Sequence, residues 1–293
     1  MSVPSLTPEA IAQLDVAEVD SLIDRLEREV PHRSAFASLD RASWERALVF
    51  GDSHGDWRAV AAVVDRFAAG GEGTVLVGLG DYVDRTPGTL PHGSAVNALY
   101  VLSVAAQYPD RVFLLQGNHE TVRRIGVVPR SFPEDLAGLW GDSVPRYERL
   151  VRLLERGPLA AATPSGAYLA HGGFPRGALP HPWTDAFSKI DDQRLEELVW
   201  SECAASVIRR GVIPAFTEAE LDRFLEESGL SVFLRGHDPD LAGRPVFRNR
   251  CLTLHTTRVY ARYGGILFAT VPLHRPIPDL SGVNVECLPP DFQ

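Results

Sequence analysis

A short apolar segment that ends in charged side chains is the feature that most constrains the fold of this chain. Residues 75–79 are Val-Leu-Val-Gly-Leu, and they are followed at once by Gly80, Asp81, Asp84 and Arg85. A continuous apolar run of this length is typical of a strand that is buried on both faces of a sheet. Glycine allows a tight turn, so we expect Asp81 to lie at the sheet edge, where open α/β sheets bind ligands.

The same pattern occurs at four other places in the chain. Apolar residues precede Asp52 and His54, then Asn118, then His171, and finally His237. A single Gly-Asp or Gly-Asn pair would predict only a turn. Because five apolar segments end with glycine beside a side chain that can bind a metal ion, we interpret them as strands whose ends meet at one site.

The segments between these strands carry helical patterns. Apolar residues repeat with the helical period over 56–69 and again before Tyr108, and residues 121–164 are predicted to be mostly helical. Alternation of strands and helices predicts βαβ units with largely parallel strands. We also predict that 252–254 and 265–269 close a second sheet, and that the proline-rich tail after Val271 is irregular.

The first 45 residues contain two signals for the start of a helix. Pro8 follows Thr7, and Asp15 with Glu18 has the spacing of a capping box. Apolar residues then share one helical face. We predict an N-terminal helical extension over residues 1–45 that covers a catalytic domain over residues 46–293. A partner-binding arm is the alternative interpretation.

The composition restricts the partners and the location of the protein. The 293 residues are 45% hydrophobic, with a formal net charge of -9 and a pI of about 5.5. An acidic protein is a poor binder of nucleic acid or of anionic membranes, so we expect neither as a partner. Because the chain has no signal-peptide pattern and no long apolar stretch, we expect a cytoplasmic protein. The sequence predicts no particular oligomeric state.

The polar residues at the strand ends form a set of donors for divalent metal ions. Three imidazoles and three oxygen donors, without a thiolate, suit manganese, iron or zinc better than calcium or magnesium alone. Asp81 can bridge two ions through its two oxygens. The six predicted ligands are Asp52, His54, Asp81, Asn118, His171 and His237.

The charge of such a site predicts an anionic substrate. Two divalent ions, two carboxylates and a bridging hydroxide leave a net charge of about +1, which favours a phosphoester. Arg85 can hold phosphate oxygens, and His119 can protonate the leaving oxygen while Asp84 holds its ring. A simple surface ion pair between Asp84 and Arg85 is the alternative.

Five short motifs contain the predicted site residues. In chain order they are Gly51-Asp52-Ser53-His54-Gly55, Gly80-Asp81-Tyr82-Val83-Asp84-Arg85, Gly117-Asn118-His119-Glu120, His171-Gly172-Gly173 and Arg235-Gly236-His237. In this order they resemble the signature blocks of the calcineurin-like metallophosphoesterases, in particular the phosphoprotein phosphatase branch. The resemblance spans about residues 47 to 271.

The resemblance implies an α/β fold, a β-sandwich of two mixed sheets flanked by helices, with the site at the sandwich edge. It implies that one ion is held by Asp52, His54 and Asp81, and that Asp81 is shared with a second ion. The other ligands of the second ion would be Asn118, His171 and His237. It also implies that His119 is a general acid paired with Asp84, and that Arg85 binds the phosphate.

Two further assignments rest on weaker parts of the resemblance. The segment 210–212, Arg-Gly-Val, is similar to one that supplies a second phosphate-binding arginine, which predicts that role for Arg210 with Arg209 as competitor. The segment 255–260 replaces the family's Ser-Ala-Pro-Asn-Tyr, and Tyr260 is the candidate active-site tyrosine. Histidines outside the five motifs, including His255, are predicted not to be ligands.

These features predict a metal-dependent phosphomonoester hydrolase, and most specifically a serine/threonine protein phosphatase. Its cofactors would be two divalent ions, manganese with iron or zinc as alternatives. Its substrates would be phosphorylated proteins or small phosphoesters. Glu120 and the Tyr82-Val83 pair favour the protein phosphatase form. A dinucleoside polyphosphate hydrolase is the alternative enzyme, and an inactive metal-binding scaffold is the alternative of another class.

Overall fold

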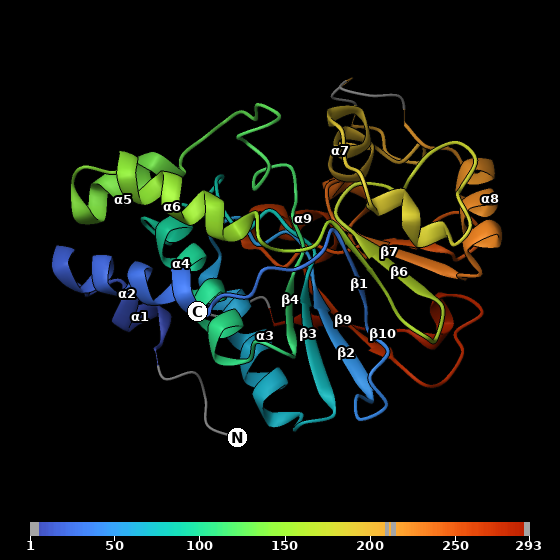
Figure 1. Cartoon of the computed structure of the whole chain (residues 1–293), viewed down its shortest axis with the longest axis horizontal. Coiled ribbons are helices and arrows are strands. Elements are labelled where there is room, and N and C mark those ends of the chain that lie inside the picture. The colour runs from blue at the N-terminus through green and yellow to red at the C-terminus, as the bar shows by residue number, and fades with distance from the viewer. Residues whose placement is uncertain (1–5, 209–210, 212–214, 290–293) are drawn as a thin grey trace.

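Two five-stranded mixed sheets lie face to face at the centre of the molecule (Figure 1). The computed structural model describes residues 6–208, 211 and 215–289. The first sheet consists of β2 (Arg46–Phe50), β3 (Thr74–Gly78), β4 (Val112–Leu114), β9 (Ile266–Pro272) and β10 (Asn284–Leu288). The second consists of β1 (Phe36–Ser38), β5 (Ala160–Ala162), β6 (Ala167–Ala170), β7 (Val232–Arg235) and β8 (Cys251–Thr253).

The strand directions bring several carboxyl ends to the same side of the sandwich. In the first sheet the order is β10-β9-β2-β3-β4, with β2, β3 and β4 parallel to one another. In the second sheet the order is β1-β5-β6-β7-β8, with β6, β7 and β8 parallel. The prediction of largely parallel strands agrees with this topology.

The strands from β3 to β8 are buried on both faces, and so is β2 after Arg46, as their apolar sequences predict. In β2, Ala47 and Val49 face the second sheet, while Leu48 and Phe50 pack under helices on the outer face. This alternation follows from the two-residue period of a strand. Alternate residues of one strand therefore belong to two hydrophobic cores, one between the sheets and one between the first sheet and its helices.

Helices cover the outer face of each sheet (Figure 1). On the side of the first sheet, α3 (Trp57–Ala69) and α4 (Gly93–Gln107) contact the strands directly. An outer group of helices packs on α4: α1 (Pro8–Ile11), α2 (Val16–Glu29), α5 (Phe132–Trp140) and α6 (Val144–Leu154). The helices on the second sheet are α7 (Asp192–Val199) and α8 (Glu218–Ser228). The short α9 (Ala261–Gly264) and the 3-10 turns Trp183–Phe187, Pro239–Leu241, Arg258–Tyr260 and Leu280–Gly282 complete the described elements. Within the described residues, no helix has both the length and the apolar character that crossing a bilayer requires.

The N-terminal helices begin where the sequence signals predict. Asp15 and Glu18 form the capping box of α2, and each side chain accepts a hydrogen bond from the other residue's backbone N–H. The apolar face of α2, including Ile23 and Leu26, is buried against the helices of the first sheet. Residues 36–38, within the range predicted as helical, form β1 and pair with β5.

Two predictions about the C-terminal third are wrong. Residues 251–253 and 266–272 do not belong to the same sheet, since β8 pairs with β7 whereas β9 pairs with β2. The tail is not wholly irregular, because residues 284–288 form β10, and each of them pairs with a residue of β9. The partner of β9 is β2, which lies far away in sequence, so local composition carries little information about that pairing. The partner of β10 is the preceding strand β9, and the prolines between the two strands conceal this pairing in the sequence.

Candidate active site

Each of the six predicted ligands follows the carboxyl end of a strand. Asp52 and His54 follow β2, Asp81 follows β3, and Asn118 follows β4. His171 and His237 follow β6 and β7 of the other sheet. The structure brings all six together, and each is at most 4% exposed. The site therefore lies at one edge of the sandwich, where both sheets contribute side chains.

Tight turns hold these side chains in place. Five residues of the site are not glycine and yet have positive φ: 43° at His54, 55° at Asp81, 62° at Asp84, 52° at Arg85 and 73° at His237. Such left-handed conformations are unfavourable for L-residues and persist only where surrounding contacts enforce them.

One glycine is required by a close approach within the site. A Cβ atom at Gly236 would overlap the Asp52 carboxylate, and the N–H of the next residue, His237, donates to that carboxylate at 3.2 Å. The glycine of the Arg-Gly-His motif therefore lets a second-sheet loop approach a first-sheet ligand.

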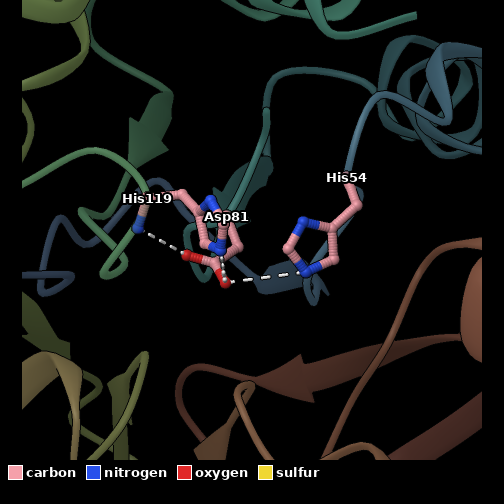
Figure 2. Close-up of side chains that lie close together, drawn as sticks. All are labelled: His54, Asp81 and His119. Atoms are coloured by element: carbon pink, nitrogen blue, oxygen red, sulfur yellow. Dashed lines mark hydrogen bonds and ion pairs between the residues drawn. The ribbon is translucent and has the colours of Figure 1, made fainter. Parts of the chain in front are cut away.

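Asp81 lies between two histidines in the first group of candidate ligands (Figure 2). Its Oδ2 atom is 3.6 Å from Nε2 of His54 and 4.0 Å from Nε2 of His119. Asp52 belongs to the same neighbourhood, with its Oδ2 atom 3.9 Å from Nε2 of His54. Separations of this size are those of atoms that can share one ion.

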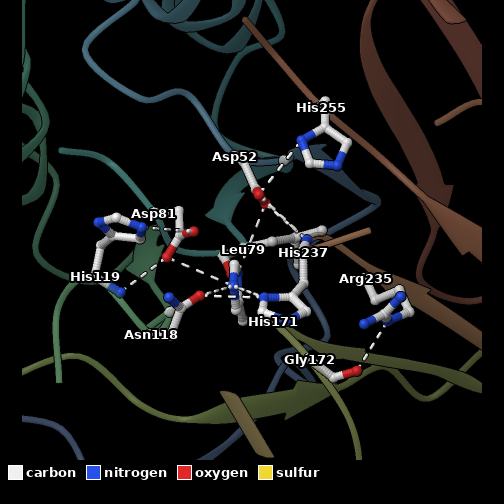
Figure 3. Close-up of polar contacts among 12 residues, drawn as sticks. Asp52, Leu79, Asp81, Asn118, His119, His171, Gly172, Arg235, His237 and His255 are labelled. Atoms are coloured by element: carbon white, nitrogen blue, oxygen red, sulfur yellow. Dashed lines mark hydrogen bonds and ion pairs between the residues drawn. The ribbon is translucent and has the colours of Figure 1, made fainter. Parts of the chain in front are cut away.

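The other oxygen of Asp81 belongs to a second group (Figure 3). Oδ1 lies 3.5 Å from Nε2 of His171, and Oδ1 of Asn118 lies 2.9 Å from the same nitrogen. Nδ1 of His237 is 3.2 Å from that Asn118 oxygen, and Asp52 Oδ1 is 3.7 Å from Nδ1 of His171. Asp81 is thus shared between two groups of candidate ligands.

The chemistry of the donors fits a pair of divalent cations. The backbone carbonyls of Val83 and Leu79 accept from Nδ1 of His54 and His171, at 3.0 and 3.1 Å, which leaves the Nε2 lone pairs facing the site. Nε2 of His54 is buried and has no hydrogen-bond partner among the described residues. A metal ion would satisfy this nitrogen.

The protonation states agree with this fit. Burial lowers the pKa of His54 to about 3 and that of His171 to about 4, so both rings are neutral at pH 7. For Asp81, burial opposes ionisation, but His171, His119 and His54 together bring the pKa below its usual value. Buried ionised carboxylates beside neutral imidazoles form a cation site.

His119 and Asp84 form a tight pair beside this cluster. Nδ1 of His119 lies 2.6 Å from Oδ2 of Asp84, and Nε2 of His119 is buried without a hydrogen-bond partner among the described residues. The other oxygen of Asp84 accepts from the backbone N–H groups of Ser131 and Phe132, at 2.6 and 2.8 Å, where α5 begins. Asp84 is 2% exposed, so the alternative of a surface ion pair with Arg85 is excluded.

Arg85 and Tyr260 meet at the rim of the site. Nη1 of Arg85 donates to the Tyr260 hydroxyl at 2.9 Å, and the Tyr260 ring lies edge-on to His54 with centroids 5.6 Å apart. Burial of Arg85 opposes its charge, but Tyr260 and Asp81 raise the pKa of the guanidinium above its usual value. Arg209 and Arg210 lie outside the described residues.

Three residues near the site have roles that the sequence analysis does not assign. Glu120 accepts backbone N–H bonds from Asp81, Tyr82 and Gly117, and burial with the Asp81 charge raises its pKa to about 8. Arg235 is fully buried and donates to the carbonyls of Gly172 and Ser201 and to Asp238.

The third of these residues is His255, whose Nδ1 atom is 3.3 Å from Oδ2 of Asp52. Glu120 and Arg235 are within motifs that the sequence analysis singles out, which is a usable signal. His255 follows the apolar residues Leu252 and Leu254, but no glycine or other ligand-like residue accompanies it. It is therefore the hardest of the three to identify from the sequence.

A family model described as calcineurin-like phosphoesterase matches residues 45–241. A probable serine/threonine-protein phosphatase of Encephalitozoon cuniculi is 28% identical over 206 residues, which are 65% of this chain and 42% of that protein. The serine/threonine-protein phosphatase 4 catalytic subunit of Saccharomyces cerevisiae is 28% identical over 67% of this chain and 63% of its own length. Serine/threonine-protein phosphatase 5 of Homo sapiens is 27% identical over 74% of this chain and 44% of its own length.

The chain spans less than two thirds of the length of each of these relatives. Among solved structures, a protein serine/threonine phosphatase from Saccharomyces cerevisiae superposes with a TM-score of 0.67 at 21% identity, over 98% of this chain and 92% of that one. At this identity the superposition is evidence for the fold.

Proposed function

Because the chain belongs to the calcineurin-like phosphoesterase family, we propose that it hydrolyses phosphomonoesters and that its substrates are phosphoserine and phosphothreonine in proteins. The observation that carries the proposal is the position of the His119–Asp84 pair and of Arg85 beside the shared carboxylate Asp81. These groups provide a proton donor and an anion-binding cation next to a site for two ions.

The ions would be held by Asp52, His54 and Asp81 on one side and by Asp81, Asn118, His171 and His237 on the other. Bound divalent ions polarise phosphoryl oxygens and generate a nucleophile from water at neutral pH. We propose manganese, since mixed imidazole and carboxylate donors without thiolate suit it.

The chain's own side chains would perform the other tasks. Arg85, fixed by its bond to Tyr260, would bind two phosphate oxygens and orient the ester. His119 would donate the proton on Nε2 to the leaving oxygen, because Asp84 holds the other ring nitrogen and keeps the ring aimed at the site. Asp84 in turn is fixed by two backbone N–H groups, which prevents it from rotating away.

The protein substrate is supported by the relatives that the chain resembles over about two thirds of its length, which are named as serine/threonine-protein phosphatases. Glu120 also supports a protein substrate. Its carboxylate accepts hydrogen bonds from the loops that carry Asp81 and Asn118, and a glutamate at this place in the motif favours the phosphoprotein phosphatase branch.

The experiment is a substrate panel on the purified chain loaded with manganese. Phosphoserine and phosphothreonine peptides, p-nitrophenyl phosphate and diadenosine tetraphosphate are compared in one preparation, and the metal content of the sample is determined by mass spectrometry. Turnover of the phosphopeptides supports the proposal. Turnover of the dinucleotide alone would favour the alternative hydrolase, and bound metal without any turnover would favour the inactive scaffold.

A further inference from the structure

We propose that His255 is an additional ligand of the ion held by Asp52 and His54. The proposal rests on the proposed function only in one respect, namely that the site binds metal ions. None of the six predicted ligands is replaced, and the new ligand comes from the segment that follows β8. Three features of His255 support this role: the burial of its ring, its distance from Asp52, and the backbone contacts that fix it.

His255 is fully buried, and its ring has unused hydrogen-bonding capacity. Neither Nδ1 nor Nε2 has a hydrogen-bond partner among the described residues. Leaving a buried polar group without a partner costs free energy, and most such groups in folded proteins are paired. A buried imidazole without a partner, next to carboxylates, therefore calls for a ligand at this place.

The distance to Asp52 is that of two atoms bound to one ion. Nδ1 of His255 lies 3.3 Å from Oδ2 of Asp52, without the geometry of a hydrogen bond (Figure 3). Nitrogen and oxygen ligands about 2.0–2.2 Å from a metal, at angles between 90° and tetrahedral, are about 3.0–3.5 Å apart. The same Asp52 oxygen is 3.9 Å from Nε2 of His54, so two imidazoles approach it.

The backbone holds His255 in this position. Residues Asp52 and His255 form a parallel β-bridge, and the N–H of Thr256 donates to the Asp52 carbonyl at 2.9 Å. The N–H of Leu267 donates to the His255 carbonyl at 2.7 Å. Tyr260 packs edge-on against the ring, with centroids 5.0 Å apart. The ring is thus kept beside Asp52 by strand pairing and packing, before any ion binds.

The decisive measurement uses the wild-type full chain, labelled with nitrogen-15 in its histidine rings and loaded with cadmium-113. A scalar coupling between the metal and a ring nitrogen appears only where the two atoms are bonded. We expect coupled nitrogens on His54, His171, His237 and His255, with the His255 signal assigned by its loss in His255→Gln. Coupling at His54 without coupling at His255 would overturn the proposal and would leave His255 as a neighbour that only orients Asp52.

A second measurement compares affinities. His255→Gln should weaken the binding of one of the two ions, measured by competition with a chromophoric chelator, by about 10-fold or more. The matched control is His274→Gln, which removes an exposed imidazole and should leave both affinities unchanged. An affinity in His255→Gln equal to wild type would also contradict the proposal.

These measurements need no substrate, so the two proposals can fail separately. Protein that shows the His255 coupling but hydrolyses no phosphoester would refute the proposed function alone. Active protein without the coupling would refute the His255 assignment alone. If His255→Gln does not fold, the number of metal-coupled histidine rings in the wild-type protein still decides: the four rings named above support the proposal, and coupling at His54, His171 and His237 alone contradicts it.

Discussion

The two ring nitrogens of His119 have different surroundings, and this difference predicts how its loss affects turnover. Because Asp84 binds Nδ1 while Nε2 faces the site, His119→Asn should remove a proton donor without removing a metal ligand. We expect turnover of an alkyl phosphate to fall by about 10²–10⁴-fold. Turnover of p-nitrophenyl phosphate should fall less, since its leaving group needs little protonation. Steady-state kinetics on both esters checks this.

Asp81→Asn is the matched comparison for that variant. It weakens the carboxylate that both ligand groups share, so metal content measured by mass spectrometry should fall along with turnover. Equal metal content in wild type and Asp81→Asn would contradict the shared role. Loss of metal in His119→Asn would instead make His119 a ligand.

Tyr260 predicts a smaller effect on substrate binding. Tyr260→Phe deletes the hydroxyl that accepts from Arg85, which should cost about 0.5–1.5 kcal/mol and lower kcat/KM by roughly 2- to 10-fold. Metal content should not change. Tyr263→Phe is the control, because that tyrosine is exposed and stacks on Arg262. An unchanged kcat/KM in Tyr260→Phe would show that Arg85 needs no support from this hydroxyl.

At the scale of single residues, the predictable part of the site is the part that follows a buried strand with glycine beside it. Asp81 and Asn118 are of this kind, and the structure brings them together with the other predicted ligands. His255 escapes this reasoning because its closeness to Asp52 arises from a β-bridge between positions 52 and 255. Contacts over such separations leave no local pattern.

At the scale of elements, helix starts are more predictable than strand partners. The capping box of α2 occurs where the sequence predicts it, since it depends on two side chains three residues apart. The sheets to which β8 and β9 belong depend on their partners β7 and β2, of which β2 lies far away in the chain, and β10 forms by pairing with β9. The composition of the tail favours irregular structure, and pairing with β9 overrides it.

The contact between α2 and α6 predicts a dependence of stability on pH. Arg149 on α6 binds Glu27 and Asp24 on α2, and the hydrogen bond from Arg149 lowers the pKa of Glu27 below its usual value near 4.5. A lowered folded-state pKa means that the stabilisation is present above the unfolded-state value and is lost as pH falls through the folded-state value.

The variant Glu27→Gln tests this contact. Because the pair is partly exposed, we expect a loss of about 0.2–1 kcal/mol near neutral pH and no loss near pH 3, measured by urea unfolding. Glu29→Gln, whose partner Arg25 lies on the same helix, is the control. A loss in Glu27→Gln that stays the same at low pH would exclude the ionic contribution.

At the scale of the whole molecule, the bound ions should stabilise the fold. Without them, the ionised carboxylates of the site face one another in a buried space between two sheets. Manganese at about 100 times its dissociation constant should add about 2.7 kcal/mol to the free energy of unfolding. Calorimetry with manganese and with a chelator should show a higher Tm in manganese. If the manganese sample contains bound metal and its Tm equals that of the sample with chelator, this prediction is contradicted.

The family and the sandwich fold predicted from the five motifs are confirmed. Motifs succeed at this scale because ligands from both sheets can meet only if the sheets face each other with their strand ends aligned. The metal itself, the substrate and the role of Arg210 stay predictions. They depend on groups outside the ligand set, where the motifs say least.

The left-handed turns at His54, Asp81, Asp84, Arg85 and His237 have a consequence for evolution and for design. Each of these backbone conformations lowers the stability of the fold by about 1–3 kcal/mol, a cost that a different sequence could avoid. Replacing these residues with glycine would relax the turns but delete the metal-binding and catalytic side chains. Selection for thermal stability and selection for activity would therefore favour different residues at these positions. Directed evolution for thermal resistance in a medium without metal ions should therefore replace the residues of this centre first.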